Sequence, residues 1–122
     1  MTHQEKERIN KFICEEIEKK CWHEVTIIDG RLPLVMYRCD KCQLVNTVSI
    51  KVLYDKLNPN YFSDSEYLPF IHRCQKEKWW DSDEGFIAHL IPPYIYPVGL
   101  LAFTFDPNQL LPALVGWWKE EK

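Results

Sequence analysis

Four residues of types that commonly bind metals lie in two short groups, Cys21-x-His23 and Cys39-x-x-Cys42, with fifteen residues between them. Two cysteines separated by two residues can both turn toward one ion, as in the knuckle of many zinc sites. Cys21 and His23 are two apart, so their side chains project to the same side of an extended segment. Three thiolates and one imidazole suit tetrahedral zinc, or less often an iron–sulfur centre. The spacing therefore predicts one zinc site with the ligands Cys21, His23, Cys39 and Cys42.

A zinc site with four protein ligands is structural, because it has no open position for water or substrate. The Cys-x-x-Cys pair could instead be a redox centre, but no strand–helix–strand segment of the thioredoxin type surrounds it. The remaining cysteines, Cys14 and Cys74, are expected to be small core residues. The chain has no phosphate-binding glycine loop and no serine-nucleophile motif. We therefore expect a protein that is not an enzyme.

The bulk composition is that of a folded protein. A chain of 122 residues with 46% hydrophobic and 14% aromatic residues suits one domain, residues 1–122. The net charge of -3 argues against a strongly nucleic-acid-binding domain. The N-terminal residues have no signal-peptide pattern, and no apolar run reaches the length of a membrane span. Clustered cysteines then favour metal over disulfides, so we expect a cytoplasmic protein without membrane contact.

The segment that contains the four ligands is expected to form a small antiparallel sheet. Residues 25–28 and 34–38 read as two strands, and Asp29-Gly30 between them is a hairpin-turn signal. Residues 44–53 are rich in Val, Ile and Thr and are expected to form a third strand. The hairpin would return the Cys39 knuckle to Cys21 and His23.

Helices are expected on either side of this segment. Thr2 and Glu5 form a capping-box pattern at the start of a helix over about residues 2–20. Ser63 and Glu66 repeat the pattern before a second helix, and Pro69 implies that this helix either starts late or has an irregular first turn. The other expected elements are helix 64–78, strands 86–91 and 100–105, and a last helix 107–120 that is bent or begins properly near Pro112.

These elements predict an α+β fold. A small antiparallel sheet with a zinc-clipped hairpin, within about residues 21–53, is flanked by an N-terminal, a middle and a C-terminal helix. A helix–strand–helix portion covers about residues 58–121. Trp79-Trp80 and Trp117-Trp118 are either binding anchors or half-buried core, and the second is the commoner role for tryptophans near helix ends.

Several short motifs follow one another in a recognisable order. An amphipathic helix is followed by Cys21-Trp22-His23-Glu24 and by Cys39-x-x-Cys42. Next come the loop Asn58-Pro59-Asn60-Tyr61-Phe62-Ser63-Asp64 and Asp106-Pro107, and the closing helix ends in Trp117-Trp118-Lys119-Glu120. The order resembles small uncharacterised bacteriophage and prophage proteins, including the phage ABA sandwich domain family. Asn60, Pro69, Pro112 and Gly116 depart from the pattern of that family.

The resemblance implies an α+β fold with a sheet between helices, a zinc clip and no established activity. The first hypothesis is a non-enzymatic, phage-encoded interaction protein that binds a host or phage protein in the host cytoplasm. One version is an inhibitor of a bacterial defence system such as CRISPR. The alternative is a nucleic-acid-binding accessory protein that uses the zinc hairpin. Its face would consist of Lys19, Lys20, Arg31, Arg38, Lys41 and Lys51 with Trp22 and Tyr37.

Overall fold

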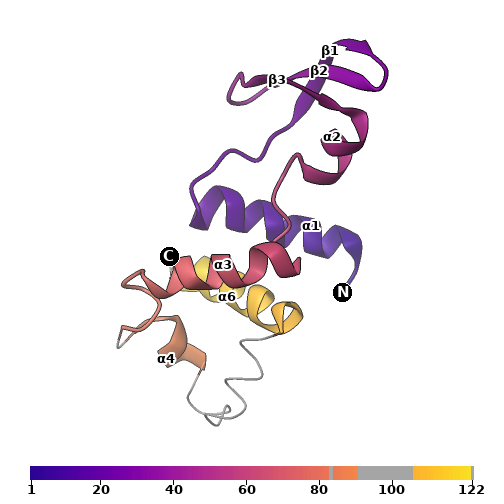
Figure 1. Cartoon of the computed structure of the whole chain (residues 1–122). Coiled ribbons are helices and arrows are strands. Elements are labelled where there is room, and N and C mark those ends of the chain that lie inside the picture. Colours follow the sequence, from indigo (N-terminus) through magenta and orange to yellow (C-terminus); the bar gives the residue numbers. More distant parts are fainter. Residues whose placement is uncertain (83, 91–105, 122) are drawn as a thin grey trace. The chain divides into compact units, whose positions relative to one another are not determined.

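The computed structural model describes residues 1–82, 84–90 and 106–121 (Figure 1). These residues form two compact units. Residues 11–59 make up the metal unit, named for the four predicted ligands that it contains. Residues 1–10 and 60–122 make up the helical unit. None of the helices among the described residues combines the length and hydropathy that a bilayer-spanning helix requires.

The metal unit contains a three-stranded antiparallel sheet in the order β1-β2-β3. Its strands are β1 (Val25–Arg31), β2 (Leu34–Cys39) and β3 (Val45–Ser49), and the helix α2 (Ile50–Lys56) follows β3 directly (Figure 1). Val35, Tyr37 and Leu53 are buried together, because alternate residues of β2 face α2. The predicted α+β class is confirmed.

The hairpin turn lies farther along the chain than the sequence predicted. β1 continues through Asp29 and Gly30 to Arg31, and Leu32-Pro33, joined by a cis peptide bond, lies between the strands. The register shifts between Ile27 and Asp29, which makes a bulge. Asp29 Oδ1 accepts the N–H of Gly30 at 2.8 Å. Asp29-Gly30 therefore belongs to an irregular strand, and the prediction of a turn there was wrong.

Only the first half of the predicted third strand is a strand in the structure. Residues 45–49 pair with β2, but the chain becomes helical at Ile50. Ser49 is the N-cap of α2, and its hydroxyl oxygen accepts the N–H of Val52 at 3.3 Å. The β-branched residues Ile50 and Val52 suggested a strand, but the cap and the burial of Leu53 favour the helix.

The helical unit begins with most of α1 (His3–Phe12), and Thr2 Oγ1 accepts the N–H of Glu5 as the capping pattern predicted. Asn10 is a buried polar residue that the sequence did not single out. Its Nδ2 donates to Asn60 Oδ1 at 3.1 Å, and its Oδ1 accepts the N–H of Tyr61 at 2.9 Å. This amide ties the two segments of the helical unit together where the chain leaves it and returns.

Three more helices complete the described part of this unit: α3 (Asp64–Gln75), α4 (Phe86–Leu90) and α6 (Pro107–Glu121). α3 starts where predicted and includes Pro69, but Ser63 makes no side-chain cap. Instead, Glu66 accepts the N–H of Asn60. The predicted strand at 86–91 is wrong, since α4 occupies residues 86–90, and the strand at 100–105 lies outside the described residues. α6 runs from Pro107 through Pro112, so a late start was also wrong.

Aromatic side chains fill part of the core of the helical unit. Trp80, Phe86 and Trp117 are buried, whereas Trp79 and Trp118 are half-buried. The ring centroid of Phe86 lies 5.4 Å from that of Trp80 and 5.7 Å from that of Trp117. The two tryptophan pairs therefore belong to one aromatic cluster, as the commoner of their two roles predicted.

Candidate metal centre

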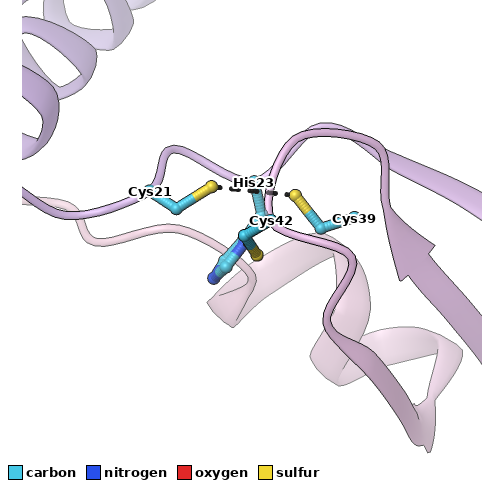
Figure 2. Close-up of side chains that lie close together, drawn as sticks. All are labelled: Cys21, His23, Cys39 and Cys42. Atoms are coloured by element: carbon cyan, nitrogen blue, oxygen red, sulfur yellow. Dashed lines mark hydrogen bonds between the residues drawn. The ribbon is translucent and has the colours of Figure 1, made fainter.

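The structure brings the four predicted ligands together within the metal unit. Their ligand atoms all lie within 4.8 Å of one another. Figure 2 shows Cys21 and His23 approaching from the segment before β1, and Cys39 and Cys42 from the end of β2 and the loop after it. Cys21 Sγ is 3.8 Å from Cys39 Sγ, and Cys42 Sγ is 3.6 Å from His23 Nδ1. These four residues could hold one metal ion.

Two of the distances between these atoms match those in a tetrahedral zinc site. With Zn–S bonds of about 2.3 Å and Zn–N bonds of about 2.0–2.1 Å, two sulfur ligands lie about 3.8 Å apart. A sulfur and a nitrogen ligand lie about 3.6 Å apart in the same geometry. Both measured distances agree with these values. All five cysteines are free thiols, so no disulfide competes for the ligands.

The end of the first helix directs Cys21 and His23 toward the site. After α1 the chain forms a single π-helical stretch, η1 (Ile13–Ile17), and Glu18 N–H bonds to the carbonyl of Ile13 at 2.8 Å. Lys19 then adopts a left-handed conformation with φ 57, which turns the chain away from the helix axis. The predicted helix over 2–20 is therefore shorter than expected, and the ligands follow in an extended segment.

Asn58 fixes the backbone of His23. Its Oδ1 accepts the N–H of His23 at 2.8 Å, and its Nδ2 donates to the carbonyl of His23 at 3.0 Å. One side chain thus satisfies both backbone groups of a ligand, as a neighbouring strand would. The sequence analysis placed Asn58 in a loop and missed this role, because its partner is 35 positions away in the chain.

The Cys39–Cys42 knuckle is positioned by β2 and by its own backbone. Asp40 N–H bonds to the carbonyl of Glu24 at 2.8 Å, which places the knuckle beside His23. Gln43, with φ 64, closes the turn, and its N–H bonds to the carbonyl of Cys39 at 3.0 Å. Backbone hydrogen bonds therefore give the knuckle its shape without a metal ion.

The thiols of the site differ in acidity. The backbone N–H of Cys42 lowers the pKa of Cys39 to about 5, since it stabilises the thiolate. Burial, followed by the neighbouring Cys39 and Cys42, raises the pKa of Cys21 to about 12. At neutral pH Cys39 is thus a preformed anionic ligand, and a metal ion must displace the proton of Cys21.

A cluster of ion pairs lies where the Cys39–Cys42 knuckle meets the segment that carries Cys21 and His23. Lys41, inside the knuckle, lies 3.3 Å from Glu24 and 3.8 Å from Glu15, and Lys11 lies 3.5 Å from Glu24. Lys41 holds the pKa of Glu24 below its ordinary value. Such exposed pairs are each worth about 0–1 kcal/mol. Their main effect is to join the knuckle to the segment that carries Cys21 and His23.

The other candidate ligands lie elsewhere. Cys14 is buried, and its thiol lies 3.6 Å from the carbonyls of Lys20 and Cys21. Cys74 is buried in α3. Both are core residues, as predicted. Among the described residues, only one group of three or more His, Cys, Asp or Glu side chains is arranged to hold a metal ion.

Replacement of Asn58 by alanine is expected to lower the free energy of unfolding of the metal unit by about 2 kcal/mol, because two partly buried hydrogen bonds to His23 are lost. Asn58→Asp keeps the acceptor but not the donor, so its effect should be intermediate. Chemical denaturation and the rate of metal loss to a chelator would measure this. Equal stability and metal retention in Asn58→Ala and the unchanged protein would contradict the positioning role.

Comparison of the chain with protein-family models, with curated proteins and with solved structures finds no match. The resemblance to phage proteins stays a prediction.

Proposed function

We propose that this protein is a non-enzymatic binding protein in which a structural zinc ion holds a hairpin as a protein-contact surface. The observation that carries the proposal is an uncovered apolar face on a sheet whose base is closed by four metal ligands. The metal provides rigidity at one end of the hairpin, and the exposed side chains of Leu32 and Leu34 lie at the other.

Zinc is the metal that fits the ligands best. Three sulfurs and one imidazole nitrogen at tetrahedral spacing are a common structural zinc set, whereas hard cations prefer oxygen. The four protein ligands fill the tetrahedron, which supports a structural role and not a catalytic one. The bound site would carry a charge of about -1, and Lys41 beside it would offset that charge.

The uncovered face follows from the register of the sheet. Because Val35 and Tyr37 face the core, Leu34 and Met36 point to the opposite side. Val45 joins them from β3, since it pairs with Arg38. Leu34 is 52% exposed, Val45 50%, and Leu32 in the turn 78%. Exposed apolar groups gathered on one rigid face are typical of protein-binding surfaces.

A shallow depression on this face gives a partner a place to dock. It has a volume of about 210 Å³, and its lining includes Leu34, Met36 and Thr47. Arg31 and Asp29 also line it and add one charge of each sign. An apolar centre with a charged border is the usual anatomy of a protein–protein contact.

A protein partner is favoured over nucleic acid. Tyr37 is 6% exposed and packs in the core, so it is not free to stack on a base. Lys41 lies between two glutamates. The metal unit has eight Lys/Arg against seven Asp/Glu, a net charge of +1 that a zinc–thiolate site would cancel. The burial of Tyr37 and the ion pairs of Lys41 therefore count against the basic and aromatic face of the alternative hypothesis.

The resemblance to phage proteins suggests which partner to expect. A small non-enzymatic phage protein acts by covering a surface of a larger host protein, and a nuclease complex of a CRISPR or other defence system is our proposed target. This finer assignment rests on the motif order in the sequence and not on the geometry of the hairpin.

The test is capture of a partner by zinc-loaded protein from nuclease-treated bacterial lysate. Leu34→Asp places a charge on the proposed face, and Leu68→Asp is a matched control on α3, where the leucine is 44% exposed. We expect the unchanged protein and Leu68→Asp to retain the same partner, a defence nuclease if the finer proposal holds. Leu34→Asp should reduce its recovery about tenfold or more with no change in zinc content.

Two results would contradict the proposal. One is recovery of the same proteins with all three variants, which would remove the hairpin face from binding. The other is a partner that is captured from untreated lysate but not from the nuclease-treated lysate, which would favour the nucleic-acid alternative.

A further inference from the structure

The helical unit contains an open cavity that the proposed function does not use. Its volume is about 320 Å³, and it lies between the segment after α3, the residues before α4, and α6. Two indoles, Trp79 and Trp117, form part of its wall. Two carboxylates, Glu84 and Glu121, and the ammonium group of Lys78 also line it.

The aromatic wall is held firmly in place. The ring centroid of Trp79 lies 5.8 Å from that of Trp117 and 5.1 Å from that of Trp118. Trp117 is buried, whereas Trp79 is half-buried at the cavity. An indole has a negative face that attracts a cation, and this attraction is strongest where the cation loses water. A half-buried indole backed by other rings is thus a prepared surface for a cation.

Backbone hydrogen bonds join the described residues on either side of the cavity rim. Phe86 N–H bonds to the carbonyl of Trp79 at 2.9 Å, and Gly85 N–H bonds to the carbonyl of Ser82 at 2.9 Å. Gly85 is buried under the rim, where a Cβ would lie 2.5 Å from the carbonyl oxygen of Trp79. These bonds and the close packing at Gly85 support the described part of the rim.

The charge around the cavity is negative. Its lining residues include two carboxylates and one ammonium group. Neither Glu84 nor Glu121 is in an ion pair within the ranges that the structure describes. The helical unit as a whole carries seven Lys/Arg and eleven Asp/Glu, a net charge of -4. An anion would be repelled here, and a neutral apolar molecule would gain no attraction from the carboxylates.

We propose that this cavity binds an organic cation with alkyl groups on its nitrogen, such as a quaternary ammonium group. Alkylated ammonium is weakly hydrated, so it can lie against indoles while remaining close to the carboxylates. A primary ammonium group holds its water too strongly for this wall. A divalent metal ion would require more oxygen ligands than two carboxylates supply.

The test is a titration of the full zinc-bound chain with choline, followed by the indole N–H signals of the tryptophans. We expect the signals of Trp79 and Trp117 to shift with a dissociation constant of about 1 mM. The neutral carbon analogue 3,3-dimethylbutan-1-ol, which has the same shape without the charge, should cause no comparable shift. A trimethyllysine peptide is titrated in parallel with choline. Tighter binding of the peptide would indicate a modified protein tail as the ligand, and tighter binding of choline would indicate a free small molecule.

Charge variants give the expected signs. Glu84→Gln and Glu121→Gln should each weaken choline binding about threefold, and Lys78→Gln should strengthen it about threefold. Glu77→Gln removes the same charge at an exposed residue that does not line the cavity and should leave binding unchanged. Equal binding of the neutral analogue, or no indole shift at about 100 times the expected constant, would overturn the proposal.

Discussion

Removal of the metal is expected to unfold residues 11–59 and to leave the aromatic core of the helical unit in place. Without an ion, three cysteine side chains and one imidazole would remain close together, and the Cys39 side chain among them is a thiolate at neutral pH. The core between the sheet and α2 is small, and its buried residues are Val35, Tyr37 and Leu53. Structural zinc contributes about 10–16 kcal/mol in small zinc-folding peptides at pH 7, which a core of this size cannot replace.

The tryptophans allow the two units to be followed separately. Trp22 is the one tryptophan within residues 11–59, and the other four lie in the helical unit. A strong chelator, or Cys39→Ser, should shift the indole signal of Trp22 to its unfolded position and lower the melting temperature of the metal unit. The near-ultraviolet circular dichroism of the other four should persist, and added zinc should restore the first signal only in the unchanged protein. A melting curve that does not change without metal would disprove the role of the site.

Two glycine-to-alanine substitutions in the helical unit are expected to have opposite effects. At Gly85 a Cβ would lie 2.5 Å from the carbonyl oxygen of Trp79 and 2.9 Å from the backbone nitrogen of Ser82. These are backbone atoms, and the carbonyl is already bonded to Phe86 N–H. Gly85→Ala should therefore lower the free energy of unfolding by about 3 kcal/mol, the upper end of usual overpacking costs.

Gly116 is the matched control. It lies within α6 and is exposed, and apart from its chain neighbours and its own helix backbone, no atom of the described residues lies within 4 Å of the position that a Cβ would take. Gly116→Ala should raise the free energy of unfolding by about 0.5–1 kcal/mol, because alanine loses less backbone entropy in a helix. Thermal melting of both variants, followed at the aromatic cluster, measures the difference. Destabilisation by both substitutions to the same degree would contradict the steric explanation.

The metal ligands could be predicted from the sequence because their chemistry is local. Cys39-x-x-Cys42 needs only a tight turn, and the pair Cys21 and His23 needs only an extended segment and a hairpin that returns. The same holds for the start of α1, where Thr2 caps the helix. Each of these features depends on residues a few positions apart.

Features that depend on distant residues could not be predicted. Asn58 and Asn10 bond to groups 35 and 50 or more positions away. Residues 50–53 contain a strand-like pattern, and their helix depends on the packing of Leu53 against Tyr37. Phe86–Leu90 also looks like a strand, but Phe86 is buried among indoles in a short helix. In each case tertiary contacts outweighed local preference.

The hydrogen bonds of Asn10 affect the conformational entropy of residues 11–59 when no metal is bound. Since Asn10 bonds to Asn60 and Tyr61, it holds together the two points where the chain enters and leaves residues 11–59. Without metal, that segment becomes a flexible loop of about 50 residues with closed ends, whose length-dependent closure cost is about 3.5 kcal/mol. The helical unit must supply this free energy until zinc orders the loop. Zinc would thus also stabilise the helical unit, which it does not contact, because an ordered segment 11–59 no longer has this entropy of loop closure.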